Sequence, residues 1–177
     1  RLTLAFLVIG TIILFVVEPS IAALGPFDRL QAAFFQTMSA STTVGFNTVP
    51  IGALGHATLL VMFFLMAIGA SPSGTGGGIK TTSFAAMLGL VRSTLKQRNP
   101  SRLQASGATF FYFMILLSVA VFLLALTEPG ASLEAMVFES ISALGTVGLS
   151  MGLTGGLSIL GKLIIIVLMT AGRVGIL

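Results

Sequence analysis

Long apolar runs alternate with short polar breaks along the chain. Leu2 to Val17 carries no charge and stops at Glu18-Pro19, where the proline removes a hydrogen-bond donor and clashes with the preceding helical turn. Ser106 to Leu126 is long enough to cross a bilayer and stops in the same way at Glu128-Pro129. A last apolar run extends from Ile159 to the C-terminus. These runs predict membrane-spanning helices.

A fourth apolar run is interrupted. Ala57 to Ala70 covers only about 21 Å as a helix, at about 1.5 Å per residue. Ser71 to Gly78 then breaks the helix, because each glycine costs roughly 1 kcal/mol and a proline about 3 kcal/mol relative to alanine. The apolar pattern resumes at Ile79 and continues towards Arg92. The sequence therefore predicts a span with a glycine-rich break.

Two further apolar stretches are too short to cross a bilayer. They cover about Leu30 to Ser39 and Leu133 to Ala143, and each leads into a Thr-Val-Gly loop. We expect short helices that enter the membrane from one side and return through these loops. Non-helical backbone at membrane depth is tolerated only where it lines a polar pathway or is buried in protein.

The order of these elements repeats along the chain. A shift of 103 residues places Thr43-Val44-Gly45 on Thr146-Val147-Gly148, and a shift of 110 places Glu18-Pro19 on Glu128-Pro129. Each copy reads long helix, short helix, loop, long helix. We therefore predict an all-α membrane protein made of two tandem pore repeats. Their predicted bounds are residues 1–92 and 105–177, with a basic linker over residues 93–104.

The composition excludes a soluble globular domain. Of 177 residues, 55% are hydrophobic and 8% are charged, whereas soluble domains carry roughly 25% charged residues. The sequence has no cysteine, which removes disulfides and thiolate metal sites. The apolar runs hold no cluster of catalytic side chains, and the basic residues do not form a nucleic-acid footprint. We therefore expect neither an enzyme nor a nucleic-acid partner.

Charge is distributed unevenly between the two ends of the spans. Four basic residues lie together between the copies, at the end of the first repeat and in the linker, and the positive-inside rule places this loop in the cytoplasm: Arg92, Lys96, Arg98 and Arg102. All five acids then fall on the outer side: Glu18, Asp28, Glu128, Glu134 and Glu139. Both Thr-Val-Gly loops are expected to open outward, towards a vestibule that attracts cations. Glu134 and Glu139 have a simpler alternative role, as partners of a helix dipole.

The two loops are candidates for an ion filter. Gly45 and Gly148 adopt a positive φ at little cost, which lets successive carbonyl oxygens point to one side and replace the water shell of a cation. Thr43 and Thr146 add hydroxyl oxygens. The candidate filter residues are Thr43, Val44, Gly45, Phe46, Thr146, Val147, Gly148 and Leu149, with the ion held by the backbone of Val44, Gly45, Val147 and Gly148. Two ordinary turns between helices are the alternative.

Four motifs together resemble the Trk/Ktr/HKT superfamily of potassium transporters, and most closely its KtrB-type bacterial uptake subunits. They are Ser-Thr-Thr-Val-Gly-Phe-Asn-Thr at 41–48, Gly-Ala-Ser-Pro-Ser-Gly-Thr-Gly-Gly-Gly-Ile-Lys-Thr at 69–81, Ser-Ala-Leu-Gly-Thr-Val-Gly-Leu-Ser at 142–150 and Gly-Arg-Val-Gly at 172–175. Members of that family place four repeats around one pore, and this chain resembles the third and fourth. Since two loops cannot encircle an ion, the resemblance implies a partial chain that needs two further repeats.

The resemblance also implies partners and a location. It predicts a multi-pass protein of the plasma (inner) membrane, surrounded by lipid, which forms a homodimer of complete subunits on a cytoplasmic nucleotide-binding regulatory ring. The transported ion is expected to be K⁺, with Na⁺ as an open alternative, and no organic cofactor is expected in this chain. The function that follows is gated, passive uptake of K⁺. A membrane-embedded assembly half-subunit, whose glycines serve close helix packing, remains the alternative.

The glycine-rich break is the candidate gate. In the family, a loop at this place interrupts the helix below the filter, and an arginine under the filter contributes to the gate. The corresponding residues are Ser71, Pro72, Ser73, Gly74, Thr75, Gly76, Gly77 and Gly78, together with Arg173. A phosphate loop is excluded because Ile79 separates the last glycine from Lys80. A passive kink, and an Arg173 side chain that reaches the membrane interface, remain the alternatives.

Overall fold

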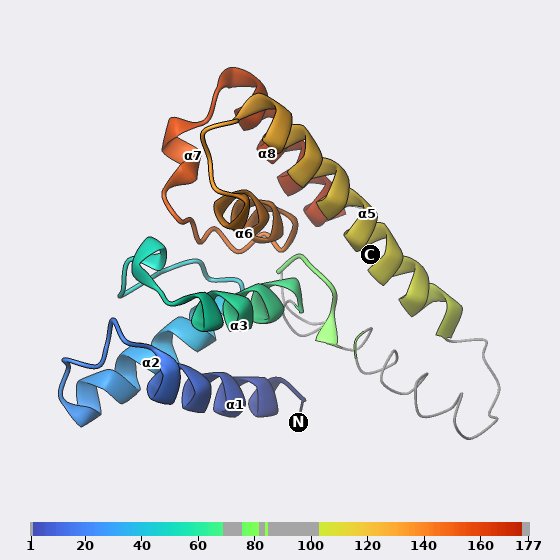
Figure 1. Cartoon of the computed structure of the whole chain (residues 1–177). Helices are drawn as coiled ribbons and strands as arrows, with labels where there is room; N and C mark the ends of the chain where they lie inside the picture. The colour runs from blue at the N-terminus through green and yellow to red at the C-terminus, as the bar shows by residue number, and fades with distance from the viewer. Residues whose placement is uncertain (1, 69–75, 82–83, 85–102, 175–177) are drawn as a thin grey trace.

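The computed structural model describes residues 2–68, 76–81, 84 and 103–174, and all of its regular elements are helical (Figure 1). They are α1 Leu2–Val17, α2 Pro26–Ser41, the 3₁₀ turn η1 Ile51–Ala53, α3 His56–Ala67, α5 Leu103–Thr127, α6 Leu133–Leu144, α7 Leu153–Gly156 and α8 Ile159–Val174. The described residues contain no β-strand. The predicted all-α fold is confirmed.

The helices form two sets with the same order of elements. In Figure 1, α1, α2 and α3 (blue to teal) lie together at the lower left, and α5 to α8 (yellow to red) lie above them. Within each set the first helix packs on the second helix, as α1 on α2 and α5 on α6. The second helix is not short in the first set, since α2 has 16 residues, as many as α1. The two sets meet where α3 packs against α6, so α6 is enclosed by helices of both sets.

The helix boundaries follow the sequence signals at most, but not all, of their ends. Helix α1 ends at Val17 and α6 begins at Leu133, as predicted. Helix α2 begins earlier than predicted, because Pro26 occupies its first turn, where a missing N–H costs nothing. Helix α3 ends at Ala67, before the glycines. The N–H of Ile68 donates to the carbonyl of Phe64 and completes the last turn. The short elements η1 and α7 were not predicted.

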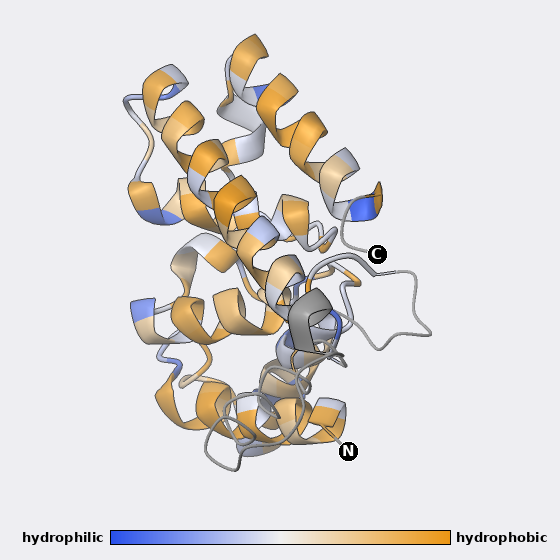
Figure 2. Ribbon diagram, turned by 90° about the vertical axis from the view of Figure 1, so that its right-hand side faces the viewer, coloured by the Kyte–Doolittle hydropathy of each residue, from blue (hydrophilic) through white to orange (hydrophobic). Residues whose placement is uncertain are grey.

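Much of the helical surface is apolar and exposed. Among the described residues, only Gly107–Thr127 is long and apolar enough to cross a membrane, while Leu2–Val17 and His56–Ala67 are shorter apolar helices. Figure 2 shows hydrophobic residues along most of the helical ribbon. The exposed apolar side chains include Leu4, Val8, Ile12 and Val16 on α1, and Phe111, Ile115, Phe122 and Leu126 on α5. Such a surface is suited to lipid rather than to water.

The interior has two apolar clusters, and one of them joins the two sets. In this joining cluster, Leu59 and Met62 of α3 are grouped with Phe138 and Ile141 of α6, and all four are buried. The aromatic rings of Phe63 and Phe138 lie 5.7 Å apart between their centroids. The contact between the sets is therefore a packed hydrophobic interface.

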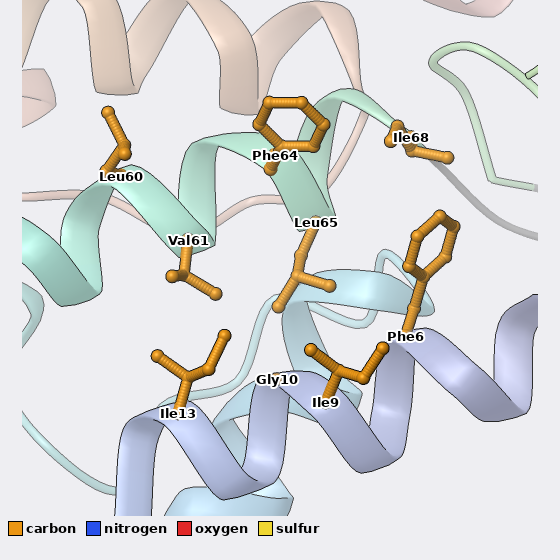
Figure 3. Close-up of a pocket in the computed structure, with 9 residues that line it drawn as sticks. All are labelled: Phe6, Ile9, Gly10, Ile13, Leu60, Val61, Phe64, Leu65 and Ile68. Atoms are coloured by element: carbon orange, nitrogen blue, oxygen red, sulfur yellow. The ribbon is translucent and has the colours of Figure 1, made fainter. Parts of the chain in front are cut away.

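Each set has an apolar groove between its first and last helices. Figure 3 shows the groove between α1 and α3, with a volume of about 250 Å³, and a groove of about 450 Å³ lies between α5 and α8. At an offset of 110, Phe6, Ile9, Gly10 and Ile13 correspond to Leu116, Val119, Ala120 and Leu123. At an offset of 103, Leu60, Val61, Phe64 and Leu65 correspond to Leu163, Ile164, Val167 and Leu168. The internal repeat thus extends to matched surface grooves.

A carboxylate at the end of the first helix holds the start of the last helix in each set. Oε2 of Glu18 accepts a hydrogen bond from the backbone N–H of Gly55 (3.1 Å), the residue before α3. Oε1 of Glu128 accepts one from the N–H of Ser158 (2.8 Å), the residue before α8. Gly55 and Ser158 are 103 residues apart, so these contacts are equivalent in the repeat. They satisfy N–H groups that a helix start leaves unpaired.

Candidate functional site

The backbone of both Thr-Val-Gly loops alternates in handedness. Thr43 and Gly45 have φ angles of 58° and 80°, and Thr146 and Gly148 have φ angles of 52° and 91°. The expected positive φ at the two glycines is confirmed. The same conformation at the two threonines was not predicted, because a β-branched residue rarely adopts it. In each loop, a left-handed residue therefore stands on either side of the valine.

Both loops are hydrogen-bonded to the helix that precedes them. The N–H of Val44 donates to the carbonyl of Ser39 (3.0 Å), and the N–H of Val147 donates to that of Ser142 (2.9 Å). The serine side chains also contact their loops, but in different ways. Ser39 Oγ donates to the carbonyl of Phe46, whereas Ser142 Oγ accepts from the N–H of Gly148. The predicted filter loops are thus anchored at equivalent positions.

The two loops lie next to each other, although they are 103 residues apart in the sequence. A Cβ atom added to Gly45 would lie 2.1 Å from the carbonyl oxygen of Val147 and 3.3 Å from the Cα of Gly148. A Cβ on Gly148 would lie 3.9 Å from the Cα of Gly45. Glycine at position 45 is therefore required both by its φ angle and by this close approach.

The apolar side chains of the two loops differ in burial. Val147 and Leu149 are 3% and 2% exposed and pack in the cluster that contains Leu59 and Met62 of α3. The equivalent side chains in the first loop, Val44 and Phe46, are 50% and 68% exposed. The difference arises because α3 covers the second loop.

Part of the glycine-rich break lies against the second loop. Ser71 to Thr75 lie outside the described residues, but Gly76, Gly77 and Gly78 are described and buried. The N–H of Gly77 donates to Oγ1 of Thr146 (2.7 Å). A Cβ on Gly77 would lie 2.8 Å from the Thr146 side chain and 3.1 Å from the carbonyl oxygen of Gly172. The break and the second candidate filter loop are therefore in direct contact.

A basic residue follows closely, in the chain, each of the two glycine positions in this contact. Lys80, which follows the glycines with one residue between, donates from Nζ to the carbonyl of Gly76 (2.7 Å). Arg173 lies in the last turn of α8 with an exposed side chain. The preceding Gly172 packs so tightly that a Cβ would lie 2.2 Å from the carbonyl oxygen of Leu144. Lys80 is a residue that sequence reasoning missed, and its position shortly after the glycines was the available signal.

Two of the five acids contact groups that the sequence did not predict. Glu139, expected to lie near a helix start, instead lies in the middle of α6, so a role as dipole partner is wrong for it. Its carboxylate accepts hydrogen bonds from the segment that follows the second loop. Glu134 does lie in the first turn of α6, and its carboxylate is 3.0 Å from Nδ1 of His56. Glu134 therefore connects the two helix sets.

His56 is 90% exposed, at the start of α3, before the apolar residues of that helix begin. The hydrogen bond to Glu134, followed by the negative charge of that carboxylate, raises the pKa of His56 above its ordinary value of 6.5. Among the described residues, no three His, Asp or Glu side chains are grouped to hold a metal ion. The oxygen atoms gathered at the two loops are backbone carbonyls and threonine hydroxyls.

The arrangement of the helices matches that of a solved membrane protein. The crystal structure of the potassium transporter TrkH from Vibrio parahaemolyticus superposes with a TM-score of 0.77 at 22% sequence identity. The match covers 98% of this chain and 40% of the TrkH chain. The chain therefore has the fold of a helical membrane transporter.

Comparison of the sequences identifies the family. Residues 2–177 match the TrkH family, described as a cation transport protein, so the chain belongs to this family. Ktr system potassium uptake protein B of Vibrio alginolyticus is 39% identical over 96% of this chain and 40% of its own length. Potassium/sodium uptake protein NtpJ of Enterococcus hirae is 38% identical over 98% of this chain and 42% of its own length. The chain thus spans about two fifths of these relatives, and the predicted resemblance to the Trk/Ktr transporters is confirmed.

Proposed function

We propose that this chain supplies two of the four repeats of a pore that carries K⁺ passively into the cell. The observation that carries the proposal is the alternating handedness at Thr43 to Gly45 and at Thr146 to Gly148. Reversal of handedness at every second residue points successive carbonyl oxygens to one side, where they replace the hydration shell of a dehydrated cation. The adjacent position of the two loops supports a shared pathway.

The proposed ion is K⁺. The relative from Vibrio alginolyticus is named for potassium uptake, and the one from Enterococcus hirae is named for potassium and sodium. Carbonyl and hydroxyl oxygens without a side-chain charge suit a weakly hydrated monovalent cation. Na⁺ remains the alternative, since discrimination depends on the number and the rigidity of the carbonyl groups in all filter loops.

The other two repeats of the proposed pore are proposed to pack against the exposed side of the first loop. Helix α3 covers Val147 and Leu149 in the second loop, whereas the equivalent Val44 and Phe46 are exposed. We assign these exposed side chains to contact with the last helix of a neighbouring repeat, as α3 contacts the second loop here. The homodimer of complete subunits and the cytoplasmic nucleotide-binding ring rest on the family resemblance.

The glycine-rich break is proposed to gate the exit from the filter. Its described part is hydrogen-bonded to Thr146 through Gly77, and it packs beside Gly172, the neighbour of Arg173. A segment that touches the filter hydroxyl on one side and the last helix on the other is placed to obstruct the pathway. Its low helix propensity lets it move at little cost. A passive kink is the alternative.

The proposed orientation follows from charge. The basic linker over residues 93–104, between the repeats at 1–92 and 105–177, is assigned to the cytoplasm of the plasma membrane. The loops and the five acids are assigned to the outer side. Cations would then enter a negatively biased vestibule before they reach the carbonyl oxygens.

Alanine variants of the loop glycines test the filter assignment. In vesicles that contain the complete transport protein, we expect Gly148→Ala and Gly45→Ala to reduce K⁺ uptake at least about tenfold. A left-handed backbone costs a non-glycine residue roughly 1–2 kcal/mol, and at Gly45 the methyl group also collides with Val147. Gly155→Ala is the control, because apart from its chain neighbours and the backbone of its own helix no described atom lies within 4 Å of its Cβ position. Normal uptake and selectivity in both loop variants would exclude the filter.

One observation favours the assembly role as a second candidate. Gly77 and Gly172 both permit backbone approaches that a Cβ would prevent, which is how small residues serve close packing in membrane proteins. Measurement of ion flux in reconstituted vesicles separates the two functions. An assembly subunit would leave K⁺ flux unchanged when its loops are altered.

A further inference from the structure

Glu139 occupies an unusual place for a carboxylate. It lies in the middle of α6, 5% exposed, behind the second Thr-Val-Gly loop. A charged group is buried at high cost unless hydrogen bonds satisfy it. Here Oε1 accepts from the N–H of Met151 (3.1 Å) and from Oγ of Ser150, and Oε2 accepts from Oγ1 of Thr154 (2.7 Å). Three donors from one short segment therefore meet this carboxylate.

These bonds hold the outer end of the loop, while a serine on the same helix holds its inner end. Ser142, one turn after Glu139, accepts hydrogen bonds from the N–H groups of Val147 and Gly148. Ser150 also accepts from the N–H of Gly152 (2.9 Å), which braces the held segment further. The loop from 147 to 151 is thus attached to one rigid helix at both ends.

The hydrogen bonds of Glu139 with Ser150, Met151 and Thr154 form a clamp on the second loop. The first repeat lacks this clamp. At an offset of 103, Gln36 replaces Glu139; it is 2% exposed, and neither its amide oxygen nor its nitrogen has a hydrogen-bond partner in the described residues. The position equivalent to Thr154 is Ile51, which has no hydroxyl group to donate. The two loops share a backbone conformation but differ in what holds them.

We propose that Glu139 is a positioning residue that fixes the carbonyl spacing of the second loop, and that it thereby helps the pore to discriminate K⁺ from Na⁺. Hydrogen bonds to an ionised carboxylate are about twice as strong as bonds between neutral groups. A loop held by three of them resists contraction around the smaller Na⁺ ion. The inference rests on the proposed filter function and adds to it the residue that stiffens one loop.

The test measures the ratio of K⁺ to Na⁺ uptake in vesicles that contain the complete transport protein. We expect Glu139→Gln to lower this ratio about tenfold, because an amide nitrogen replaces one acceptor oxygen. Thr154→Val, an exposed position on the other side of the clamp, should lower it about threefold. Gln36→Leu is the matched control at the equivalent position and should leave the ratio unchanged.

The double variant Glu139→Gln, Thr154→Val separates a clamp from two unrelated effects. Because both changes alter the same contact, the one between residues 139 and 154, their combined effect on the ratio should be smaller than the product of the single effects. Unchanged selectivity in both folded single variants would overturn the proposal. A lower yield of folded protein, with a normal K⁺ to Na⁺ ratio in the protein that does fold, would overturn it too. If Glu139→Gln does not fold, Thr154→Val decides.

The result with Gly148→Ala distinguishes a failed clamp from a failed filter. If Gly148→Ala impairs K⁺ uptake while the variants of Glu139 and Thr154 keep normal selectivity, the filter stands and only the clamp is excluded. If none of the three variants alters uptake or selectivity, the filter itself is excluded.

Discussion

Thr43 and Thr146 hold a backbone conformation that β-branched residues rarely adopt. Their positive φ angles cost roughly 1–2 kcal/mol each relative to the right-handed region. The same cost recurs at equivalent positions in both repeats, next to glycines that adopt positive φ freely. Hydrogen bonds from the following valines to Ser39 and Ser142 maintain it. Strain that is retained twice at one place indicates that the loop backbone itself has a role.

A residue-level prediction concerns Lys80 and the proposed gate. Its ammonium group donates to the carbonyl of Gly76, and the neighbouring Gly77 holds Thr146. We expect Lys80→Met to loosen this segment and to raise K⁺ flux in vesicles about tenfold or more, since a hydrogen bond from a charged group contributes about 1.5–3 kcal/mol. Lys162→Met, on the exposed surface of α8, is the matched control.

Arg173→Ala should also raise the flux if the side chain contributes to the gate, as the family resemblance implies. A flux that neither Lys80→Met nor Arg173→Ala changes would identify the glycine-rich break as a passive kink. Because the Lys80 side chain is half-buried, the thermal midpoint of each variant should be measured beside the flux.

At the scale of the elements, each repeat uses a Glu-Pro pair in two ways. The proline ends the first helix of the set, and the glutamate then accepts a hydrogen bond at the start of the last helix. The sequence indicated only the first use. The second required the fold, because Glu18 and Gly55 are far apart in the chain and meet only when α1 and α3 pack together.

The two glutamates provide a test of this helix-start contact. Glu128→Ala should destabilise the complete protein by about 1–2 kcal/mol, the usual effect of a lost helix cap, because the N–H of Ser158 loses its acceptor. Glu18→Ala should cost more, since Glu18 is 1% exposed and also accepts from the N–H of Ser20. Asp28→Asn, at an exposed helix start, serves as the control. Thermal unfolding in detergent measures all three. Equal midpoints for Glu18→Ala and Asp28→Asn would contradict the assignment.

Helix ends were predictable where a local signal decides them. Proline after Glu18 ends α1, and Ser132 accepts a hydrogen bond from the N–H of Ala135 to begin α6. The start of α2 was predicted too late, because the polar residues after Pro26 do not continue the apolar pattern from which the helix was predicted. The short elements η1 and α7 have three and four residues, too few to show a periodic pattern of their own.

At the scale of the whole molecule, one junction joins the two repeats. Helix α3 packs on α6, and an ion pair between His56 and Glu134 spans the same junction at its exposed edge. The hydrophobic part involves buried side chains such as Met62 and Phe138 and is independent of pH. Only the ion pair is expected to respond to pH.

The pH response of this ion pair can be predicted in sign. Because Glu134 raises the pKa of His56 in the folded protein, the stabilisation is complete below the unfolded value of about 6.5 and is lost as pH rises through the raised pKa. His56→Gln should therefore lower the thermal midpoint of the complete protein at about pH 6 and leave it unchanged at about pH 9. Glu134→Gln should reproduce this pattern. An equal loss at both pH values would mean that His56 acts through packing instead.

The sequence by itself determined the fold class, the two repeats, the position of the glycine-rich break and the resemblance to the Trk/Ktr transporters. Apolar runs, prolines and glycines act within a few residues, so their consequences are legible along the chain. The tertiary structure alone decided that the two Thr-Val-Gly loops touch, that Gly77 reaches Thr146 and that Glu139 holds the segment after the second loop. These contacts join residues from different elements, and their geometry exists only once α3, α6 and α8 have packed around the second loop.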